Sequence, residues 1–190
     1  MTFHKYIMSL CLLLCMPVYA ATIDVTVNHA TPDAIPFCTT FTITISHTDF
    51  PQTGGATVGV IWNPDVLDLT SITTDTFLFG VFPDAPSEEE QAAGEIVLLT
   101  LLGSLIDPSL DPVGSFDSMI LTFFAIAAGT SDIIIDESGA ARGWDTSDAE
   151  RITGIIYNQA MVNVVIPVPA AIWLFGSSLG LLGWVRRKSF

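Results

Sequence analysis

The chain has 190 residues, of which 50% are hydrophobic, and it carries 20 acidic side chains against only 6 lysines and arginines. This length suits one domain of ordinary size with terminal addressing segments. All the acidic residues lie between Asp24 and Glu150, and Arg142 and Arg151 are the only basic residues between Lys5 and Arg186. Such an acidic region repels phosphate backbones, so the charge distribution argues against nucleic acid as a partner.

The first 20 residues have the pattern of a secretory signal peptide. Lys5 precedes an apolar run, YIMSLCLLLCM, that is too short for a comfortable membrane span, and the sequence PVYA follows with small residues before a cleavage site. We expect cleavage between Ala20 and Ala21. The alternatives are an uncleaved anchor and a lipoprotein acylated at Cys15, although a leucine, which is not small, precedes that cysteine.

Cys38 is the single cysteine of the expected mature chain, because the other two lie in the signal peptide. Neither an intramolecular disulfide nor a cysteine-based metal site is then available. The segment FCTTFTITISHT (37–48) alternates in polarity, which predicts a strand with Cys38 on its polar face. Neither His29 nor His47 lies within a few residues of Cys38, so we interpret the thiol as structural or incidental rather than catalytic.

Ten segments between residues 22 and 165 are rich in Ile, Val, Thr and Phe and are separated by Gly, Pro and Asp turns. They predict short strands without a sustained helical period, and therefore an all-β fold built as a two-sheet antiparallel sandwich. The segments are TIDVTVN (22–28), FCTTFTITISHT (37–48), ATVGVIW (56–62), VLDLTSIT (66–73), TFLFGVF (76–82), EIVLLTLLG (95–103), SMILTFFAIAAG (118–129), SDIIID (131–136), RITGIIYN (151–158) and QAMVNVV (159–165). Residues 83–94, with one helical turn at 87–93, and residues 103–115 are predicted to be surface loops.

The body offers no recognisable catalytic group. It contains no lysine, and neither mature histidine belongs to a motif with a nucleophile. Pairs of carboxylates are abundant, but the sequence does not show which of them lie close enough to act together on a glycosidic bond. The body has two tryptophans, Trp62 and Trp144, that could line a sugar cleft, and one of them is expected in the core. We interpret the body as non-enzymatic, with a secreted carbohydrate-active enzyme as a weaker alternative.

The segment GWDTSDAERITG (143–154) is the best candidate for a metal site, with Asp145, Asp148 and Glu150 as candidate calcium ligands. Calcium takes six or more oxygen ligands, which carboxylates and carbonyls of one loop can supply. The spacing does not match an EF-hand, so a solvated turn entering the last hairpin is the favoured interpretation. No other cofactor is expected. The run 88–90, three glutamates, is interpreted as a solvated face.

The order and spacing of three stretches resemble the cohesin-like family of β-sandwiches: GGATVGVIWNPDVLDLTSI, GSFDSMILTFFAIAAGTSDIIID and ITGIIYNQAMVNVV, which span most of residues 22–165. The resemblance implies a jelly roll of about nine strands, covering residues 21–165, without a catalytic centre. Cohesins bind dockerin modules, but this chain has neither a row of modules nor a recognisable dockerin. The implied activity is binding of a protein or polysaccharide through a sheet face or loop tips.

From Val164 to Val185 the chain has 22 residues without a charge, long enough to cross a bilayer. Pro167 and Pro169 disfavour a helix at the start of this stretch, so we expect a transmembrane helix to begin near Ala170. A buried C-terminal core helix is the alternative. The basic cluster that follows predicts a membrane stop on the cytoplasmic side, with the body outside; it consists of Arg186, Arg187 and Lys188.

The tail combines Pro167, Val168, Pro169 and Ala170 with the segment WLFGS (173–177) and the basic end. This combination resembles the PEP-CTERM class of bacterial sorting signals, particularly the variant built on Val-Pro-Leu-Pro-Ala. The chain departs from that pattern with isoleucine at 166 and valine at 168. The resemblance implies that a membrane protease of the exosortase type recognises the proline motif, removes the helix and passes the body to the cell envelope, cell surface or extracellular matrix.

The sequence thus predicts three parts: a signal peptide (1–20), a sandwich (21–165) and a sorting signal (166–190). Together they describe an exported, non-enzymatic surface or matrix protein that passes through an inner-membrane intermediate. The main alternative keeps the tail as a permanent anchor, which would make the protein a membrane-tethered module that binds a protein or carbohydrate.

Overall fold

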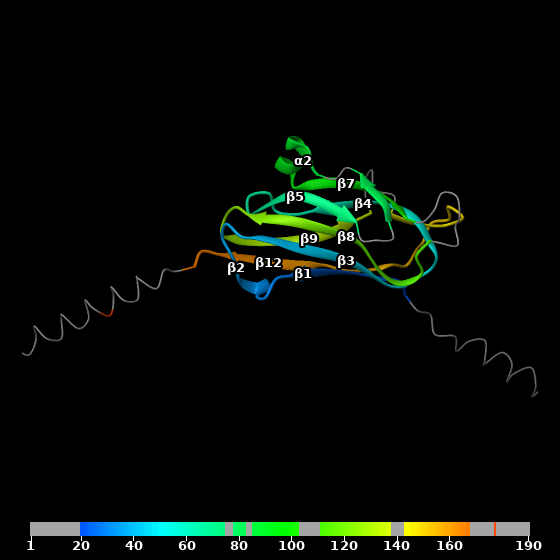
Figure 1. Ribbon diagram of the computed structural model, residues 1–190, viewed down its shortest axis with the longest axis horizontal. Helices are drawn as coiled ribbons and strands as arrows, with labels where there is room; N and C mark the ends of the chain where they lie inside the picture. Colours follow the sequence, from blue (N-terminus) through cyan, green and yellow to red (C-terminus); the bar gives the residue numbers. More distant parts are fainter. Residues whose placement is uncertain are drawn as a thin grey trace, which may run out of the picture.

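In the computed structural model the chain folds into two β-sheets packed face to face (Figure 1). The structure describes residues 20–74, 78–82, 85–102, 111–137 and 143–167, together with Ser177. The predicted all-β sandwich of two sheets is confirmed. The described strands number five in one sheet and seven in the other, more than the nine that the resemblance implied.

Each sheet combines strands that are far apart in the sequence. The first sheet runs in the order β11 (Ile156–Asn158), β1 (Thr22–Asn28), β3 (Thr40–Phe50), β8 (Gly114–Ala125) and β5 (Leu67–Thr74). The second runs in the order β2 (Ile35–Pro36), β12 (Ala160–Val165), β9 (Gly129–Asp136), β4 (Thr53–Ile61), β7 (Glu95–Leu102) and β6 (Leu78–Phe82), with β10 (Gly143–Thr146) also paired to β4. A short 3-10 helix, η1 (Pro32–Ala34), and one α-helix, α2 (Glu88–Ala93), lie between strands.

Alternation of polarity explains why these segments form strands with one buried face. In β3, Phe41, Ile43 and Ile45 are buried, and the threonines between them point outward. Phe123 and Leu121 of β8 lie opposite Phe41 and Ile43, and the two phenylalanine rings stack with centroids 6.0 Å apart. Burial of such a side chain contributes roughly 1.5–3 kcal/mol. The second sheet adds buried aliphatic residues to the same core, among them Val58, Val60, Ile96, Leu98, Ile133 and Val162.

The predicted antiparallel pairing is wrong at two places. β1 pairs in parallel with β11, and β2 pairs in parallel with β12, whereas the other pairs are antiparallel. The cause lies near the end of the body, where β11 in the first sheet is followed after one residue by β12 in the second. The chain therefore changes sheet without reversing its direction.

Positive backbone dihedral angles shorten two of the predicted strands. The segment 37–48 begins its strand only at Thr40, because Cys38 has φ 61°, which ends the pairing of β2 and turns the chain. The segment 151–158 forms a strand only at its end, after Gly154 with φ 77°. The short strands β2 and β10 were not predicted, since two and four residues carry too little periodicity.

The predicted helical turn at residues 87–93 is confirmed as α2. Ser87 caps it in a capping box: its Oγ accepts from the N–H of Glu90, and the Glu90 carboxylate accepts from the N–H of Ser87 at 2.9 Å. That backbone bond, followed by the bond from the Ser87 hydroxyl, lowers the pKa of Glu90. At the other end Gly94 adopts φ 68°, and Gln91 reaches β5, where its amide donates to Asp68 and its oxygen accepts from Leu69 N–H.

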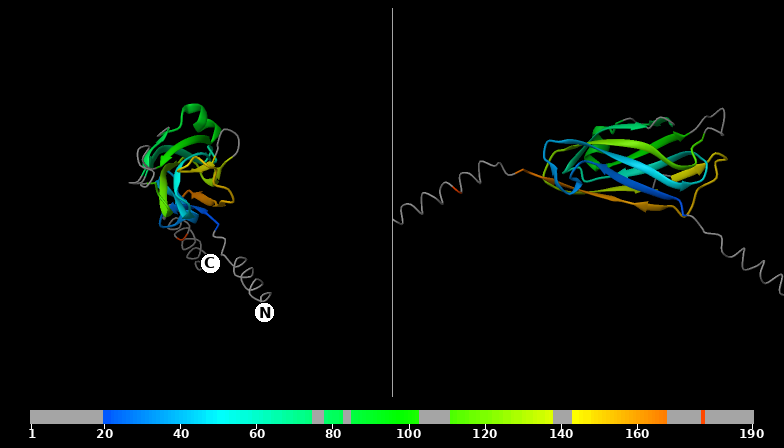
Figure 2. Two further views of the ribbon diagram at one scale, coloured as in Figure 1. Left: turned by 90° about the vertical axis from the view of Figure 1, so that its right-hand side faces the viewer. Right: turned by 60° about the horizontal axis from the view of Figure 1, so that its bottom comes forward.

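The body is elongated, and β1 begins at one pole whereas β12 ends at the other (Figures 1 and 2). Within the described residues, the structure contains no helix that is long and apolar enough to span a membrane. The predicted transmembrane segment, from residue 170 onward, lies outside them except for Ser177.

Candidate binding surface

The two mature histidines do not form a catalytic pair. His29 lies in the turn after β1, where its Nδ1 accepts from the N–H of Thr31 at 3.2 Å. His47 lies in β3 opposite Ile23, at the other end of β1, and is 1% exposed. Several residues of strand at roughly 3.3 Å each therefore separate the two rings.

His47 is the polar centre of an aromatic cluster. Its ring stacks on Phe116 with centroids 4.5 Å apart and contacts Phe50 and Trp144 edge-on at 4.6 and 4.3 Å. Burial lowers its pKa from 6.5 to about 3, so the imidazole is neutral at physiological pH. Its Nδ1 finds no hydrogen-bond partner among the described residues. Such a ring holds the sheets together and is closed to substrate.

A β-bulge supplies a polar partner for His47. Ile45 pairs with Met119 and Ser46 pairs with Asp117, so Ser118 is the extra residue and turns inward with Met119. The Ser118 Oγ lies 2.8 Å from Nε2 of His47 and donates to the carbonyl of Ile45 at 3.3 Å. Because the hydroxyl proton is used on that carbonyl, Nε2 of His47 carries the proton and donates to Ser118. Strand alternation alone places His47 on the face of Ile43 and Ile45, whereas the bulge has no clear sequence signal.

The prediction that Cys38 lies on the polar face of a strand is wrong. The residue lies in the turn between β2 and β3. Its side chain is exposed and its N–H donates to the carbonyl of Ala125 at 2.9 Å. The preceding residue, Phe37, donates its N–H to Val165 at 2.8 Å. The turn thus joins the end of β8 to the end of β12, with the thiol directed to solvent.

The candidate calcium residues form a tight turn. Thr146 donates its N–H to the carbonyl of Glu150 at 2.8 Å, and Ala149, with φ 59°, donates to Thr146 at 2.9 Å. Among the described residues no three His, Cys, Asp or Glu side chains gather as metal ligands would, so Asp145, Asp148 and Glu150 are not brought together. The segment is a hairpin turn that follows β10.

Only one of the two tryptophans in the body was expected in the core, but both are buried, Trp62 at 3% and Trp144 at 0% exposure. Trp62 packs edge-on against Phe123 with centroids 6.0 Å apart, and Trp144 completes the cluster around His47. Neither ring is available to stack on a sugar. The aromatic platform that a carbohydrate-active cleft would need is therefore missing from these two positions.

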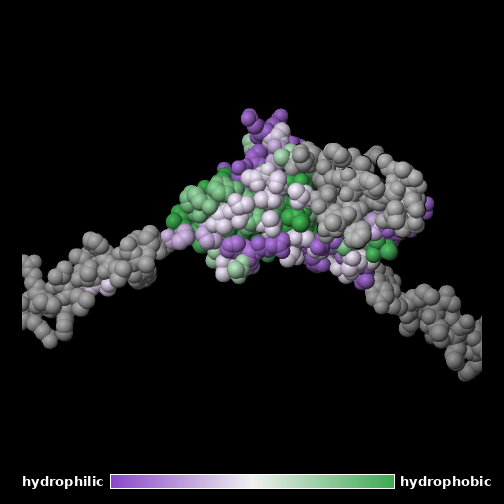
Figure 3. All heavy atoms as spheres, viewed as in Figure 1, coloured by the Kyte–Doolittle hydropathy of each residue, from purple (hydrophilic) through white to green (hydrophobic). Residues whose placement is uncertain are grey.

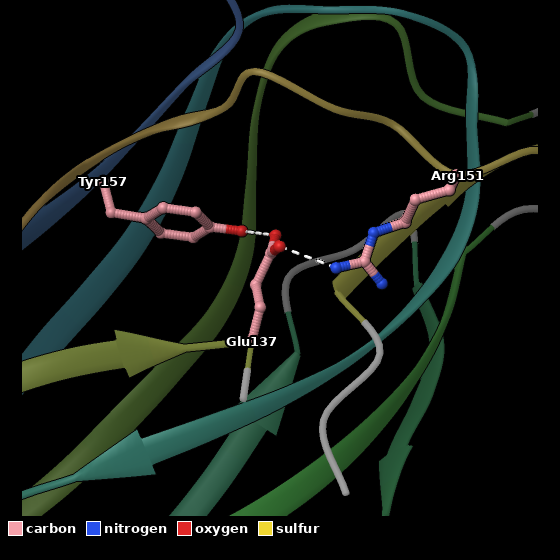
Figure 4. Close-up of polar contacts among 3 residues, drawn as sticks. All are labelled: Glu137, Arg151 and Tyr157. Carbon is pink, nitrogen blue, oxygen red and sulfur yellow. Dashed lines mark hydrogen bonds and ion pairs between the residues drawn. The ribbon is translucent and has the colours of Figure 1, made fainter. Parts of the chain in front are cut away.

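One charged cluster ties three segments together at the pole near the expected N-terminus. The carboxylate of Glu137, after β9, lies between the guanidinium of Arg151 at 2.6 Å and the phenol of Tyr157, which donates to it (Figure 4). Gly143, with φ 73°, leaves room for this pair, since a Cβ there would lie 2.4 Å from Arg151 Nη2. Both charged side chains are partly exposed, so the ion pair contributes at most about 1 kcal/mol.

The outer face of the first sheet is rich in hydroxyl groups. Asn28, Thr42, Thr122 and Ser71 lie side by side in register across four strands. The Asn28 amide donates to Thr42 Oγ1 at 3.3 Å and to Thr44 Oγ1 at 2.7 Å. We call this the hydroxyl face.

The outer face of the second sheet mixes aliphatic and acidic side chains. Ile61 of β4 lies between Ile134 of β9 and Glu95 of β7, all outward-facing. One row along, Gly59 lies between an aspartate and a valine, and Met161 of β12, 60% exposed, lies opposite Asp132. We call this the mixed face; its members are Ile61, Glu95, Val97, Asp132, Ile134, Asp136 and Met161. None of these residues was singled out from the sequence, although the alternation of Asp132, Ile134 and Asp136 with buried isoleucines is a signal that they face outward.

The described residues include part of each predicted processing site. Ala20 and Ala21 precede β1, and Ala21 is 8% exposed, with its carbonyl accepting from Ile156 N–H at 2.9 Å. At the other pole β12 ends at Val165, and Ile166 and Pro167 are exposed. The rest of the sorting motif, Val168, Pro169 and Ala170, and the membrane stop, Arg186, Arg187 and Lys188, lie outside the described residues.

Several solved structures with the same architecture are cohesins. The second type II cohesin module of the adaptor scaffoldin of Acetivibrio cellulolyticus superposes with a TM-score of 0.61 at 14% identity, covering 80% of this chain and 95% of that one. A type I cohesin of Pseudobacteroides cellulosolvens gives 0.58 at 15% identity, with 80% and 96% covered. The chain has the cohesin fold.

The fold extends beyond cellulosomes. A non-cellulosomal cohesin from the archaeon Archaeoglobus fulgidus has a TM-score of 0.57 at 10% identity, covering 77% of this chain and 92% of that one. A cohesin of Acetivibrio cellulolyticus solved in complex with a dockerin gives 0.57 at 11% identity, with 76% and 99% covered. No protein-family model and no curated protein matches the chain.

Proposed function

We propose that this chain is an exported, non-catalytic binding protein. Its C-terminal segment holds it at the membrane until an exosortase-type protease releases or transfers the sandwich to the cell surface or extracellular matrix. The observation that carries the proposal is the position of the folded body between the two expected processing points. Ala21, the first residue expected after signal cleavage, is buried, whereas Ile166 and Pro167 at the start of the sorting motif are exposed.

The C-terminal position suits cleavage of the folded body, and both cuts leave the core whole. A protease requires accessible backbone, and a body that survives cleavage must not lose packed residues. The last buried strand residue is Val164, at 2% exposure, so a cut after Pro167 removes no core side chain from β12. A cut before Ala21 likewise leaves β1 and its pairing with β3 whole.

The binding role is supported by the fold and by the mixed face. Cohesins of this fold are solved in complex with dockerins, which are protein partners. The mixed face places partly exposed Ile61, Ile134 and Val97 beside the carboxylates of Glu95 and Asp136. Apolar contact area with charged neighbours is the composition of a protein interface, and its negative sign favours a basic partner. The ligand of the module is therefore proposed to be a protein with apolar and basic contact residues.

Polysaccharide is the second candidate ligand, and the hydroxyl face favours it. Its aligned hydroxyl and amide groups could bond sugar hydroxyls over a flat surface. However, Asn28 already satisfies two of these hydroxyls, and no tryptophan of the body is exposed on a sheet face. The mixed face is therefore favoured.

Processing is tested by changing the prolines of the motif. In the native host, the double variant Pro167→Ala, Pro169→Ala is expected to remain in the membrane fraction, while the unchanged chain is found mainly in the released fraction. Pro51→Ala, a proline change in an exposed turn of the body, is the matched control and should be released like the unchanged chain. Release of the double variant to the same extent as the control would contradict the proposal, and so would an unchanged chain retained wholly in membranes, which would indicate a permanent anchor.

The binding surface is tested by placing the same charge on each sheet. Met161→Lys with Val97→Lys changes the mixed face, and Thr26→Lys with Thr42→Lys changes the hydroxyl face. A protein partner identified with the unchanged body should lose at least about tenfold in affinity for the first variant, since repulsion between the new lysines and a basic partner costs about 1.4 kcal/mol or more. It should bind the second variant as before. The reverse pattern would assign binding to the hydroxyl face.

A further inference from the structure

The pole from which the C-terminal segment leaves carries exposed apolar side chains. Phe37 is 40% exposed, Ile126 39% and Ile166 64%. Figure 3 shows hydrophobic surface at this pole. We call these three residues the exit patch.

Backbone hydrogen bonds hold the exit patch together. The N–H of Phe37 donates to Val165, the residue before Ile166, at 2.8 Å. The N–H of Cys38 donates to Ala125, the residue before Ile126, at 2.9 Å. Three segments that are distant in the sequence therefore present their apolar residues at one place, with the exposed Cys38 among them.

The length of chain between the patch and the apolar tail limits how far apart they can be. Only four residues, Ile166 to Pro169, separate the end of β12 from the expected helix start at Ala170. At roughly 3.1–3.3 Å per residue they span about 13 Å at most, and their two prolines make the connection stiff. If the tail lies in a bilayer, this pole is held against the bilayer surface.

We propose that the exit patch rests on the lipid surface while the tail is inserted, so that the sandwich stands on the membrane on this pole and directs its opposite pole outward. This inference rests on the proposed membrane intermediate. Transfer of Phe and Ile side chains from water to the apolar side of the headgroup region lowers the free energy.

The charges around the exit patch indicate which headgroup charge the lipid should carry. Asp33 in η1 and Asp65 in the turn before β5 are exposed at this pole. Asp65 precedes Val66, whose carbonyl accepts from Ile126 N–H at 2.9 Å, and the carbonyl of Asp33 accepts from Asn163 at 3.0 Å. Two carboxylates beside the patch repel anionic headgroups, so the contact is apolar and suits a zwitterionic bilayer surface.

Cys38 provides the probe, because it is the single cysteine of residues 21–190. This chain is reconstituted in phosphatidylcholine vesicles that contain some lipid with a nitroxide on its headgroup, and Cys38 carries a fluorescent label. The matched control moves the label to the opposite pole with Cys38→Ser and Glu150→Cys. We expect several-fold stronger quenching at Cys38 than at position 150. The quenching should fall with Phe37→Ser plus Ile126→Ser, remain with the control Val113→Ser, and weaken when anionic lipid is added.

Three results would overturn the inference. Equal, weak quenching at both labels in chains that float with the vesicles would show a body that stands clear of the membrane, and would leave the proposed anchoring intact. A Cys38 label that is shielded from water but insensitive to the lipid nitroxide would point to contact with a second copy. A chain that does not float at all would overturn both this inference and the membrane intermediate on which it rests.

Discussion

Acidification from pH 7 to pH 4 is expected to remove about 3 kcal/mol from the free energy of unfolding of the sandwich through His47 alone. The pKa of His47 falls from 6.5 to about 3 on folding, because the ring is buried among Phe50, Phe116 and Trp144. Between these two values the unfolded chain binds a proton that the folded chain does not. The contribution of the neutral His47 ring to the free energy of unfolding is therefore fully present well above pH 6.5. It is lost progressively as the pH falls toward 3.

The control is a side chain that keeps the hydrogen bond but does not titrate. His47→Gln can still donate to Ser118, and it should flatten the dependence of the unfolding free energy on pH between 7 and 4, whatever it costs at neutral pH. Glu90, whose pKa is lowered, also destabilises the fold as it protonates, but only below about 4.5. Urea unfolding at a series of pH values measures these slopes. An unchanged slope in His47→Gln would contradict the account of the buried ring.

Replacement of Gly94 by alanine is expected to destabilise the sandwich by about 3–5 kcal/mol, the combined cost of backbone strain and overpacking. Gly94 has φ 68°, and a Cβ there would lie 2.4 Å from the carbonyl oxygen of Trp62 and 2.5 Å from Cδ of Pro64. Neither neighbour is the far end of a flexible side chain. The carbonyl of Gly94 also accepts from Trp62 N–H at 2.8 Å, so displacing this residue disturbs the junction of α2 with the end of β4.

Gly154 is the matched control. It has φ 77°, but no described atom lies within 4 Å of the position a Cβ would take. Gly154→Ala should therefore cost only the strain of the left-handed backbone, about 1 kcal/mol. Thermal or urea unfolding of the two variants compares them directly. If both lost the same stability, close approach of Trp62 and Pro64 would not be the reason for a glycine at position 94.

Much of the fold follows from period-two alternation. The ten predicted segments all contain strands, because each carries enough Ile, Val, Phe and Thr for one buried face. The alternation also places Ile61 and Ile134 outward and His47 inward, although their partners lie far away in the sequence. What the alternation cannot supply is pairing direction, which is why the parallel contacts of β11 and β2 were missed.

The environment of His47 shows the other limit. Its partner Ser118 turns inward only because β8 has one residue more than β3 at that point, and such a bulge depends on the register of two strands. Likewise Trp144 becomes core because the four residues of β10 pair with β4. In both cases a tertiary contact, rather than local propensity, decides which side chain is buried.

We propose that a folded sandwich is cut from its apolar tail after export. The most direct test is the intact mass of the protein recovered from the native host, in the membrane and in the released fraction. We expect a released chain that starts at Ala21 and ends between Pro167 and Ala170. A chain that still ends at Phe190 and occurs only in membranes would contradict release and would identify a permanently tethered binding module.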